Sequence, residues 1–249
     1  MALEKNKIDK SVPIPLYFQL RELLLAEIKK GNFKSDELIP TENELCEIFE
    51  LSRTTVRQAI AELVQEGYLY RMKSKGTFVA RPKINQNFLT KIESFSSSME
   101  RQGFTASTQV LEMEVLPANV DVAKHLNIQE DDKVIFLHRK RSANGEPLVT
   151  IKTYLPYERC GFLLEEDLTK ESLYSVLGRD ENTKIVRIER RVEAIEATAK
   201  DLEYLGVRKG KPIQYFSSVG CNVFGEPIEY SLARYRADRS VFEITVAPE

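Results

Sequence analysis

Residues 41–79 read TENELCEIFELSRTTVRQAIAELVQEGYLYRMKSKGTFV, and this stretch predicts two helices joined by a tight turn and followed by a β-hairpin. Thr41 with Glu44 three residues later has the pattern of a capping box, which predicts a helix over residues 42–49. Ser52 is a natural N-cap for a second helix. The spacing of these caps leaves only a short turn between the two helices.

The segment after the second helix predicts a hairpin with a basic tip. Gly67 can take the left-handed conformation that ends a helix. Residues 68–71 then alternate as Tyr-Leu-Tyr-Arg, residues 73–76 (Lys-Ser-Lys-Gly) form a turn, and residues 77–79 return as the second strand. A tip of this composition can lie on phosphates or enter a minor groove.

The second helix has two distinct faces. Apolar residues at i, i+4, i+7 and i+8 predict a core-facing stripe of Val56, Ile60, Leu63 and Val64. The opposite face holds Thr54, Arg57, Gln58 and Ala61, with Arg53 at its N-terminal edge. Arg can bond bidentately to guanine, Gln to adenine, and Thr and Ala methyl groups can contact thymine. The outward face therefore suits the major groove of DNA.

Local charge distinguishes this interpretation from an amphipathic helix pair whose charges are merely solvated. Residues 51–81 carry six Lys or Arg and two Glu, whereas residues 1–50 carry seven basic and ten acidic groups. The formal net charge of the chain is −2, so the positive field is confined to one segment. This confinement favours DNA binding.

The same segment resembles the winged helix-turn-helix of the GntR family of bacterial transcription regulators. The matching motifs are Pro15-Leu16-Tyr17 with Gln19-Leu20, Ile39-Pro40-Thr41-Glu42-Asn43-Glu44-Leu45, Ser52-Arg53-Thr54-Thr55-Val56-Arg57, Glu66-Gly67-Tyr68-Leu69 and Gly76-Thr77-Phe78-Val79. The resemblance implies that Asn43, Arg53, Thr55, Arg57, Lys73 and Gly76 contact DNA. Many relatives carry Arg where this chain has Asn43.

The outward face of the second helix, the basic hairpin tip and the family resemblance together predict one set of DNA-binding residues. Its members are Asn43, Ser52, Arg53, Thr54, Thr55, Arg57, Gln58, Arg71, Lys73, Lys75 and Gly76.

Length and composition predict two domains of a cytoplasmic protein. A chain of 249 residues with 42% hydrophobic residues suits two cores better than one. We expect a winged helix-turn-helix over residues 1–80, a polar linker over 81–91 and a second domain over 92–249. The chain has neither a signal-like leader nor an apolar run of about 18 residues. Three widely spaced cysteines indicate reduced thiols, and no membrane partner is expected.

The N-terminal part of the chain predicts a supporting helix. Pro15 suits its first position, Leu16, Leu20, Leu23, Leu24 and Ile28 form its core face, and Gly31 ends it.

The second domain alternates long strands with short helices. We expect a helix over residues 92–102 and strands over 105–116, 133–143, 147–155, 185–194, 213–222, 228–237 and 242–246. Asn144-Gly145 and Phe224-Gly225 read as hairpin turns. One series of elements occurs twice, about 80 residues apart: a helix, a charged turn, a strand, Gly-Glu-Pro and a second strand. This repeat indicates an internal duplication, with a pocket near the boundary between the two copies. Convergent hairpin chemistry is the alternative.

The second domain shows no sequence pattern of an enzyme. It lacks a nucleophile elbow, metal-ligand spacing, phosphate-loop glycines and a dinucleotide fingerprint. We therefore assign no catalytic residue, no metal site and no cofactor.

Cationic residues on one strand are the stronger signal. Arg139 and Arg141 alternate, so both project from the same face of a sheet. Two guanidinium groups there repel each other unless an anion neutralises their charge, and a phosphate would do so through charge-assisted bidentate hydrogen bonds. A solvated sheet face is the alternative. Glu229 and Tyr235 on the last hairpin would suit the hydroxyls of a sugar, or else belong to an ordinary salt-bridged strand.

Residues 92–246 also resemble the UTRA effector domain of HutC-type GntR regulators, which is similar in fold to chorismate lyase. The resembling pieces are Ile92-Glu93-Ser94-Phe95-Ser96, Arg139-Lys140-Arg141 ahead of Asn144-Gly145-Glu146-Pro147, Tyr154-Leu155-Pro156, Ser172-Leu173-Tyr174, Glu229-Tyr230 and residues 235–239. The resemblance implies an effector site formed by Ser94, Phe95, Ser96, Arg139, Arg141, Ser172, Tyr174, Glu229 and Tyr235. Relatives usually bring a further carboxylate to the pocket where this chain has Ile151, followed by Lys152.

The sequence therefore predicts an α+β protein: a winged helix-turn-helix followed by a mixed antiparallel-sheet UTRA domain. We expect a homodimeric regulator, acting as a repressor, that binds double-stranded operator DNA of twofold symmetry under the control of a small phosphosugar-like effector. The alternatives are a non-phosphorylated carboxylate, amino-acid catabolite or fatty acid as effector, or a second domain that is an enzyme or only dimerises.

Overall fold

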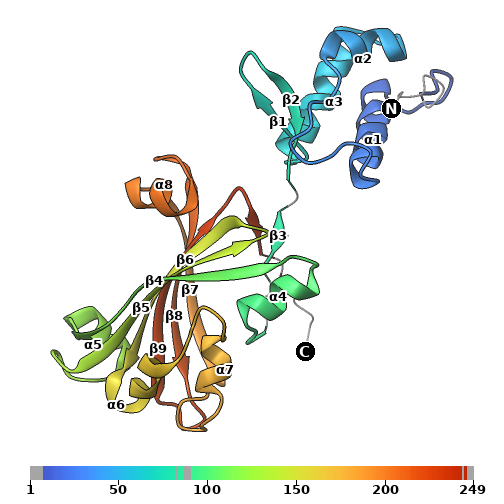
Figure 1. The fold of residues 1–249 in the computed structure, drawn as a ribbon. Coiled ribbons are helices and arrows are strands. Elements are labelled where there is room, and N and C mark those ends of the chain that lie inside the picture. The colour runs from blue at the N-terminus through green and yellow to red at the C-terminus, as the bar shows by residue number, and fades with distance from the viewer. Residues whose placement is uncertain (1–7, 82, 87–90, 243, 246–249) are drawn as a thin grey trace. The chain divides into compact units, whose positions relative to one another are not determined.

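The computed structural model describes residues 8–81, 83–86, 91–242 and 244–245. The chain divides into two compact units, Met1–Pro82 and Lys83–Glu249, which are described separately (Figure 1). The first holds three helices and a hairpin, and the second a six-stranded sheet with short helices, so the predicted α+β class is confirmed.

The first unit has the helix-turn-helix and hairpin that its sequence predicts. Its elements are α1 (Leu16–Lys29), α2 (Glu42–Phe49), α3 (Arg53–Gln65), β1 (Leu69–Met72) and β2 (Gly76–Val79). The hairpin of β1 and β2 is the wing of this unit, and an isolated β-bridge between Leu38 and Phe78 extends it. Pro15 is the N-cap of α1 rather than its first residue.

The predicted caps fix where α2 and α3 begin. The Glu44 N–H donates to Thr41 Oγ1 at 3.3 Å, and the Thr41 N–H donates to Glu44 Oε2 at 2.7 Å, which completes the capping box. The Thr55 N–H donates to Ser52 Oγ at 3.2 Å. After α3, Gly67 takes a φ of 80°, the left-handed conformation that ends the helix.

One apolar core holds the first unit together. Side chains from all three helices and both strands meet in it; its buried members are Leu20, Leu24, Leu25, Ile39, Leu45, Phe49, Leu51, Val56, Ala59, Ile60, Leu63, Leu69 and Val79. This packing buries one face of α3 and leaves the other to solvent.

The second unit is built on one antiparallel sheet in the order β4-β5-β6-β9-β8-β7. Its strands are β4 (Ala106–Pro117), β5 (Lys133–Ala143), β6 (Glu146–Pro156), β7 (Arg187–Glu196), β8 (Pro212–Cys221) and β9 (Pro227–Arg236). The short helices are α4 (Phe95–Arg101), α5 (Val120–Leu126), α6 (Tyr157–Cys160), α7 (Leu173–Leu177) and α8 (Ala199–Leu205), with a 3-10 turn over Gly161–Glu165.

The sheet order shows that the repeat seen in the sequence is also a repeat of structure. Elements β4-α5-β5-β6 and β7-α8-β8-β9 occupy equivalent positions, and the strand order is symmetric about the β6–β9 pair. The helix of each copy ends at a left-handed residue, Asn127 with φ 53° and Gly206 with φ 69°. The seam between the copies is therefore the antiparallel pairing of β6 with β9.

Several boundaries differ from those the sequence predicts. Helix α4 begins at Phe95 rather than residue 92, because Ser94 caps it by accepting from the Ser97 N–H at 3.1 Å. Phe224-Gly225 is not a two-residue turn: the Asn222 side-chain oxygen accepts from two N–H groups across a five-residue loop. The strand expected over 242–246 is wrong at Phe242, and residues 243 and 246 lie outside the described residues.

Part of the range predicted to be a linker is packed structure. Two short strands, β3 (Ile84–Asn85) and β10 (Ser240–Val241), pair in parallel, which makes the sheet content of the unit mixed. The Ile84 side chain is 2% exposed and belongs to a core with Phe95 and Met99 of α4. Residues 84–86 thus belong to the second unit.

Two further observations concern the cysteines and the possibility of membrane-spanning helices. Cys46, Cys160 and Cys221 are free thiols. Among the described helices, none is both long and apolar enough to span a lipid bilayer.

A buried ion pair anchors α8 to β9 and gives a stability prediction. Asp201 is 2% exposed and accepts from Arg234 Nε and Nη2 at 2.7 Å each, and from the Thr198 N–H at 2.6 Å. Burial raises the pKa of Asp201, but the hydrogen bonds from Arg234 and Thr198 outweigh it, so the pKa is lowered. Asp201→Asn should lower the free energy of unfolding by about 2–3 kcal/mol, measured by urea denaturation at neutral pH.

The matched control is Glu193→Gln, which breaks an exposed pair with Arg191 and should change that free energy by less than about 1 kcal/mol. Because the pKa of Asp201 is lower in the folded protein than in the unfolded chain, its contribution to the free energy of unfolding is complete at pH values above its unfolded-state pKa. The contribution is lost as the pH falls through its folded-state pKa. The difference between wild type and Asp201→Asn should therefore shrink below about pH 4. Equal losses in the two variants would contradict this assignment.

Candidate functional sites

The outward face of α3 is exposed as the helical period predicts. Thr54, Arg57, Gln58 and Ala61 lie on the surface, whereas Val56, Ile60 and Leu63 are buried. Arg53 is also exposed. The first unit therefore presents a helix face whose side chains have the donors and methyl groups used in base recognition.

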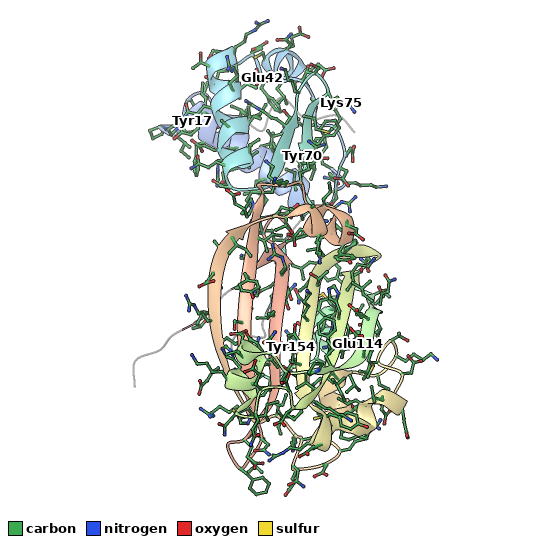
Figure 2. The ribbon with its side chains drawn as sticks, turned by 90° about the vertical axis from the view of Figure 1, so that its left-hand side faces the viewer. Tyr17, Glu42, Tyr70, Lys75, Glu114 and Tyr154 are labelled. Carbon is green, nitrogen blue, oxygen red and sulfur yellow. The ribbon has the colours of Figure 1, made fainter. Side chains whose placement is uncertain are left out.

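The wing adds a second cationic element to this unit. Arg71, Lys73, Lys75 and Gly76 are all exposed, and Lys75 is labelled on this unit in Figure 2. The turn depends on left-handed residues, Ser74 at φ 62° and Gly76 at φ 119°. A Cβ at Gly76 would lie 2.5 Å from Leu38 Cδ1, so a side chain there would strain both the backbone and this contact.

One carboxylate connects α2, α3 and the wing. Glu42, at the start of α2 and labelled in Figure 2, has carboxylate oxygens 3.8 Å from Arg57 Nε and 3.2 Å from Arg71 Nη2. The Arg57 side chain nevertheless keeps 67% of its surface exposed. Glu42 therefore lies beside two cations that stay exposed, a contact that sequence reasoning missed because the partners meet only in the folded unit.

Two members of the predicted DNA-binding set have a local structural role. The Ser52 and Thr55 hydroxyls lie 2.8 Å apart and cap α3. Asn43 is exposed on α2. For every residue of the predicted DNA-binding set, contact with DNA stays a prediction.

The second unit contains a pocket on the inner face of its sheet, across the β6–β9 seam. Side chains of α4, α7 and five of the strands surround it, together with Gln86 beside β3. Its lining residues are Gln86, Glu93, Ser94, Phe95, Ser98, Arg139, Arg141, Ile151, Ser172, Leu173, Tyr174, Arg190, Phe216, Ser218, Glu229, Ser231, Ala233 and Tyr235. Both copies of the duplication therefore contribute to it.

Arg139 and Arg141 both line this pocket, as their alternation on β5 predicts. Arg139 is 2% exposed, and neither its Nε nor its Nη1 has a hydrogen-bond partner. Arg141 Nε also has none, and its guanidinium lies 5.4 Å from the centre of the Phe95 ring. Burial, and then the charge of Arg141, lower the pKa of Arg139 to about 9, so the guanidinium is charged at neutral pH.

A hydrogen-bonded acid and two tyrosines stand beside the arginines. Tyr174 donates its hydroxyl to Glu229 Oε2 at 2.8 Å, and Glu229 is 4% exposed. Burial raises the pKa of Tyr174 well above its usual value and that of Tyr235 to about 12. Both hydroxyls therefore stay protonated and can donate, while the Glu229 carboxylate can accept.

The pocket brings together eight of the nine residues predicted for the effector site. They are Ser94, Phe95, Arg139, Arg141, Ser172, Tyr174, Glu229 and Tyr235. Ser96 is not among the lining residues. The Ser94 hydroxyl is already engaged with Ser97, 2.8 Å from its Oγ.

The structure also revises the other half of the pocket. Ile151 lines it, but Lys152 faces the opposite side of β6, with Nζ 5.9 Å from the centre of the Phe136 ring. Arg190 on β7 and Gln86 line the pocket and were missed. Alternation along a strand predicts a face, but only the order of strands in the sheet shows that β7 reaches the same pocket as β5.

The histidines give no indication of a catalytic centre. His125 stacks on Tyr230 with ring centres 4.1 Å apart. His138 is buried, and burial lowers its pKa. Within the described residues, no group of three or more His, Cys, Asp or Glu side chains could hold a metal ion.

Comparison with known families assigns each unit separately. Residues 16–79 match the family described as bacterial regulatory proteins, gntR family. Residues 101–240 match the UTRA domain.

Known relatives match both units together. The HTH-type transcriptional repressor NagR of Bacillus subtilis (strain 168) is 33% identical over 94% of this chain and 96% of its own. A probable fructoselysine utilization operon transcriptional repressor of Escherichia coli (strain K12) is 30% identical over 92% of this chain and 93% of its own. The crystal structure of PhnF from Mycobacterium smegmatis matches with a TM-score of 0.68 at 27% identity, over 92% of this chain and 99% of that one.

The lack of hydrogen-bond partners for Arg139 Nε and Nη1 leads to a stability prediction. Arg139→Met, which keeps the length and removes the buried charge, should raise the free energy of unfolding by about 1–3 kcal/mol in buffer without phosphate or sulfate. The matched control is Arg234→Met, which removes an arginine paired to Asp201 and should lower that free energy. Urea denaturation of the full chain measures both. Similar destabilisation in the two variants would mean that Arg139 is held by the protein itself.

Proposed function

The chain belongs to the GntR family of bacterial regulatory proteins, in its HutC-type branch with a UTRA domain, and we propose that it is a homodimeric repressor of a twofold-symmetric operator that responds to a phosphorylated sugar-like metabolite. The observation that carries the effector half is the pair formed by buried Arg139 and half-buried Arg141, in which three buried donor nitrogens, Arg139 Nε and Nη1 and Arg141 Nε, have no hydrogen-bond partner. The exposed face of α3 carries the DNA half.

The winged unit is suited to reading a DNA half-site. In this proposal α3 enters the major groove, where Arg57 and Gln58 bond to base edges and Thr54 contacts a thymine methyl. Lys73 and Lys75 of the wing contact phosphates, which position the unit without reading sequence. In the protein without DNA, Glu42 accepts a hydrogen bond from Arg71 and lies beside Arg57.

A phosphoryl group suits the cationic end of the pocket. Its oxygens can accept charge-assisted bonds from both guanidinium groups and neutralise their mutual repulsion. Glu229 can then accept from a sugar hydroxyl, and Tyr235 can donate to one. The name of the fructoselysine relative supports a sugar derivative as effector, and the names of both relatives support repression.

A carboxylate is the chemical competitor of a phosphate at this pair. Both anions can bond bidentately to Arg. The departure at Ile151 leaves the sugar half without the carboxylate usual in relatives, so neutral, amino and acidic sugars must be compared directly.

The DNA half is tested with Arg57→Ala. This change should weaken specific binding by about 1–3 kcal/mol, because a bidentate base contact is lost, while effector affinity is unchanged. Fluorescence anisotropy on an operator selected from a random duplex pool measures the loss. Arg191→Ala, which removes an exposed arginine of the second unit, is the control. If both variants bind the operator as wild type does, α3 is not the recognition helix.

The effector half is tested with a melting-temperature screen and Arg139→Ala. The panel is glucose 6-phosphate, glucosamine 6-phosphate and 6-phosphogluconate, each beside its unphosphorylated form. At a hundred times its dissociation constant, a specific ligand should add about 2.7 kcal/mol of stability. Arg139→Ala should keep operator affinity and lose both this stabilisation and effector-dependent release.

Lys140→Ala is the matched control, since Lys140 lies between the two arginines on β5 and does not line the pocket. Release that survives in Arg139→Ala, or a panel in which phosphorylation makes no difference, would reject the phosphate site.

A further inference from the structure

Unsatisfied polar atoms gather in one place in this protein. Eight buried side-chain nitrogen or oxygen atoms of the described residues have no hydrogen-bond partner, and five of them belong to residues that line the pocket. These five are Gln86 Nε2, Ser98 Oγ, Arg139 Nε, Arg139 Nη1 and Arg141 Nε. Buried polar groups are normally hydrogen-bonded, so such a cluster marks groups reserved for another molecule.

Gln86 differs from the others because it does not belong to the six-stranded sheet or to a helix. It directly follows β3, is 2% exposed, and donates its backbone N–H to the Val241 carbonyl at 2.8 Å. The Ile84 N–H donates to the Arg239 carbonyl at 2.8 Å. These bonds hold β3 against β10 and leave the Gln86 amide in the wall of the pocket.

The short strand is also tied to α4. Gln102, the C-cap of α4, donates from Nε2 to the Asn85 carbonyl at 2.8 Å. The other end of α4 supplies Ser94 and Phe95 to the pocket. A ligand in the pocket therefore meets β3 both through Gln86 and through the helix that braces it.

We propose that Gln86 is an effector-binding residue, which donates from Nε2 to an oxygen of the ligand held by Arg139 and Arg141 and thereby fastens β3 to the pocket. This inference rests on the function proposed above. Phosphorylated sugars suit it, because their phosphoryl and hydroxyl oxygens can accept from an amide and from guanidinium groups at once.

The bond would make the docking of β3 sensitive to the ligand. Among the described residues, the ladder between β3 and β10 has two register pairs, Ile84 with Ser240 and Asn85 with Val241, so it is short. When β3 docks against β10 without a ligand, the Gln86 Nε2 donor is buried without a hydrogen-bond partner. When a ligand is bound, the proposed bond satisfies this donor. The ligand must then bind the docked state more tightly, and this difference sets the largest coupling it can exert.

Chain connectivity gives this docking a consequence for the winged unit. Gln86 follows Val79, the last residue of β2, by seven positions, so the intervening chain can span at most about 25 Å. Fastening β3 fixes one end of this short tether. Occupancy of the pocket is thereby communicated along the chain.

The experiment measures ligand affinity and hydrogen exchange in the full-length protein. The probes are glucose 6-phosphate, glucosamine 6-phosphate and 6-phosphogluconate, and the variants are Gln86→Met, which keeps the length without a donor, and Gln86→Asn, which withdraws the amide by one methylene. In wild type, a saturating probe should slow exchange of the Ile84 and Gln86 amides at least fivefold. Both variants should bind that probe about fivefold more weakly and lose the slowing.

Lys83→Met and Arg139→Ala separate the outcomes. Lys83 is exposed beside β3, so its variant should behave as wild type. If Arg139→Ala loses probe binding while both Gln86 variants keep wild-type affinity and protection, the inference about Gln86 is wrong and the proposed function stands. If no probe binds wild type, or Arg139→Ala binds as wild type does, the proposed function fails and this inference fails with it.

Discussion

Two guanidinium groups on one face of β5 line the pocket with three buried donor nitrogens that have no hydrogen-bond partner, and they are the constraint around which the pocket is built. Arg139 and Arg141 repel each other, and burial disfavours their charged forms. A sheet face selected only for stability would carry apolar side chains there. Burying like charges without hydrogen-bond partners costs stability, and such costs are characteristic of binding sites. The remaining parts of the unit must therefore supply stability elsewhere.

The duplicated sheet supplies it. Its cores are shared between the copies: α5 of the first copy packs on β9 of the second, α8 of the second packs on β6 of the first, and Leu148 and Val149 lie in one core with Phe216 and Ala233. The pocket lies where the copies meet, so one copy contributes the arginines of β5 and the other contributes Glu229 and Tyr235 of β9. A single copy would contain only half of the site. The β6–β9 pairing is thus both the centre of the fold and the floor of the pocket.

Residues whose roles depend on local periodicity were predictable, and those whose roles depend on tertiary register were not. The period of 2 on β5 placed both arginines on one face, and the period of 3.6 on α3 placed Arg57 outside and Val56 inside. Arg190 was missed because its strand is the far edge of the sheet, a position that only the strand order reveals. Gln86 was missed because its polar surroundings read as linker, although β3 packs in a core.

The boundary errors have the same origin. Ser94 competes as an N-cap and shortens α4, which the apolar pattern alone had extended back to Ile92. Phe242 contributes an apolar side chain to the core without belonging to a strand. Local pattern identifies which residues are buried more reliably than it identifies the backbone conformation that buries them.

Arginine has opposite physical roles in the two units, and this difference bears on how they are coupled. Arg57 is exposed, so the interactions of its charge are screened by salt, whereas those of buried Arg139 are screened much less. Strong binding at Arg139 and Arg141 does not by itself produce regulation. Both lie on β5 inside the sheet, and a contact that is equal in two conformations contributes affinity without shifting their populations. Coupling requires a ligand contact on an element whose position changes, and among the residues that line the pocket, Gln86 lies beside the short strand nearest in sequence to the winged unit.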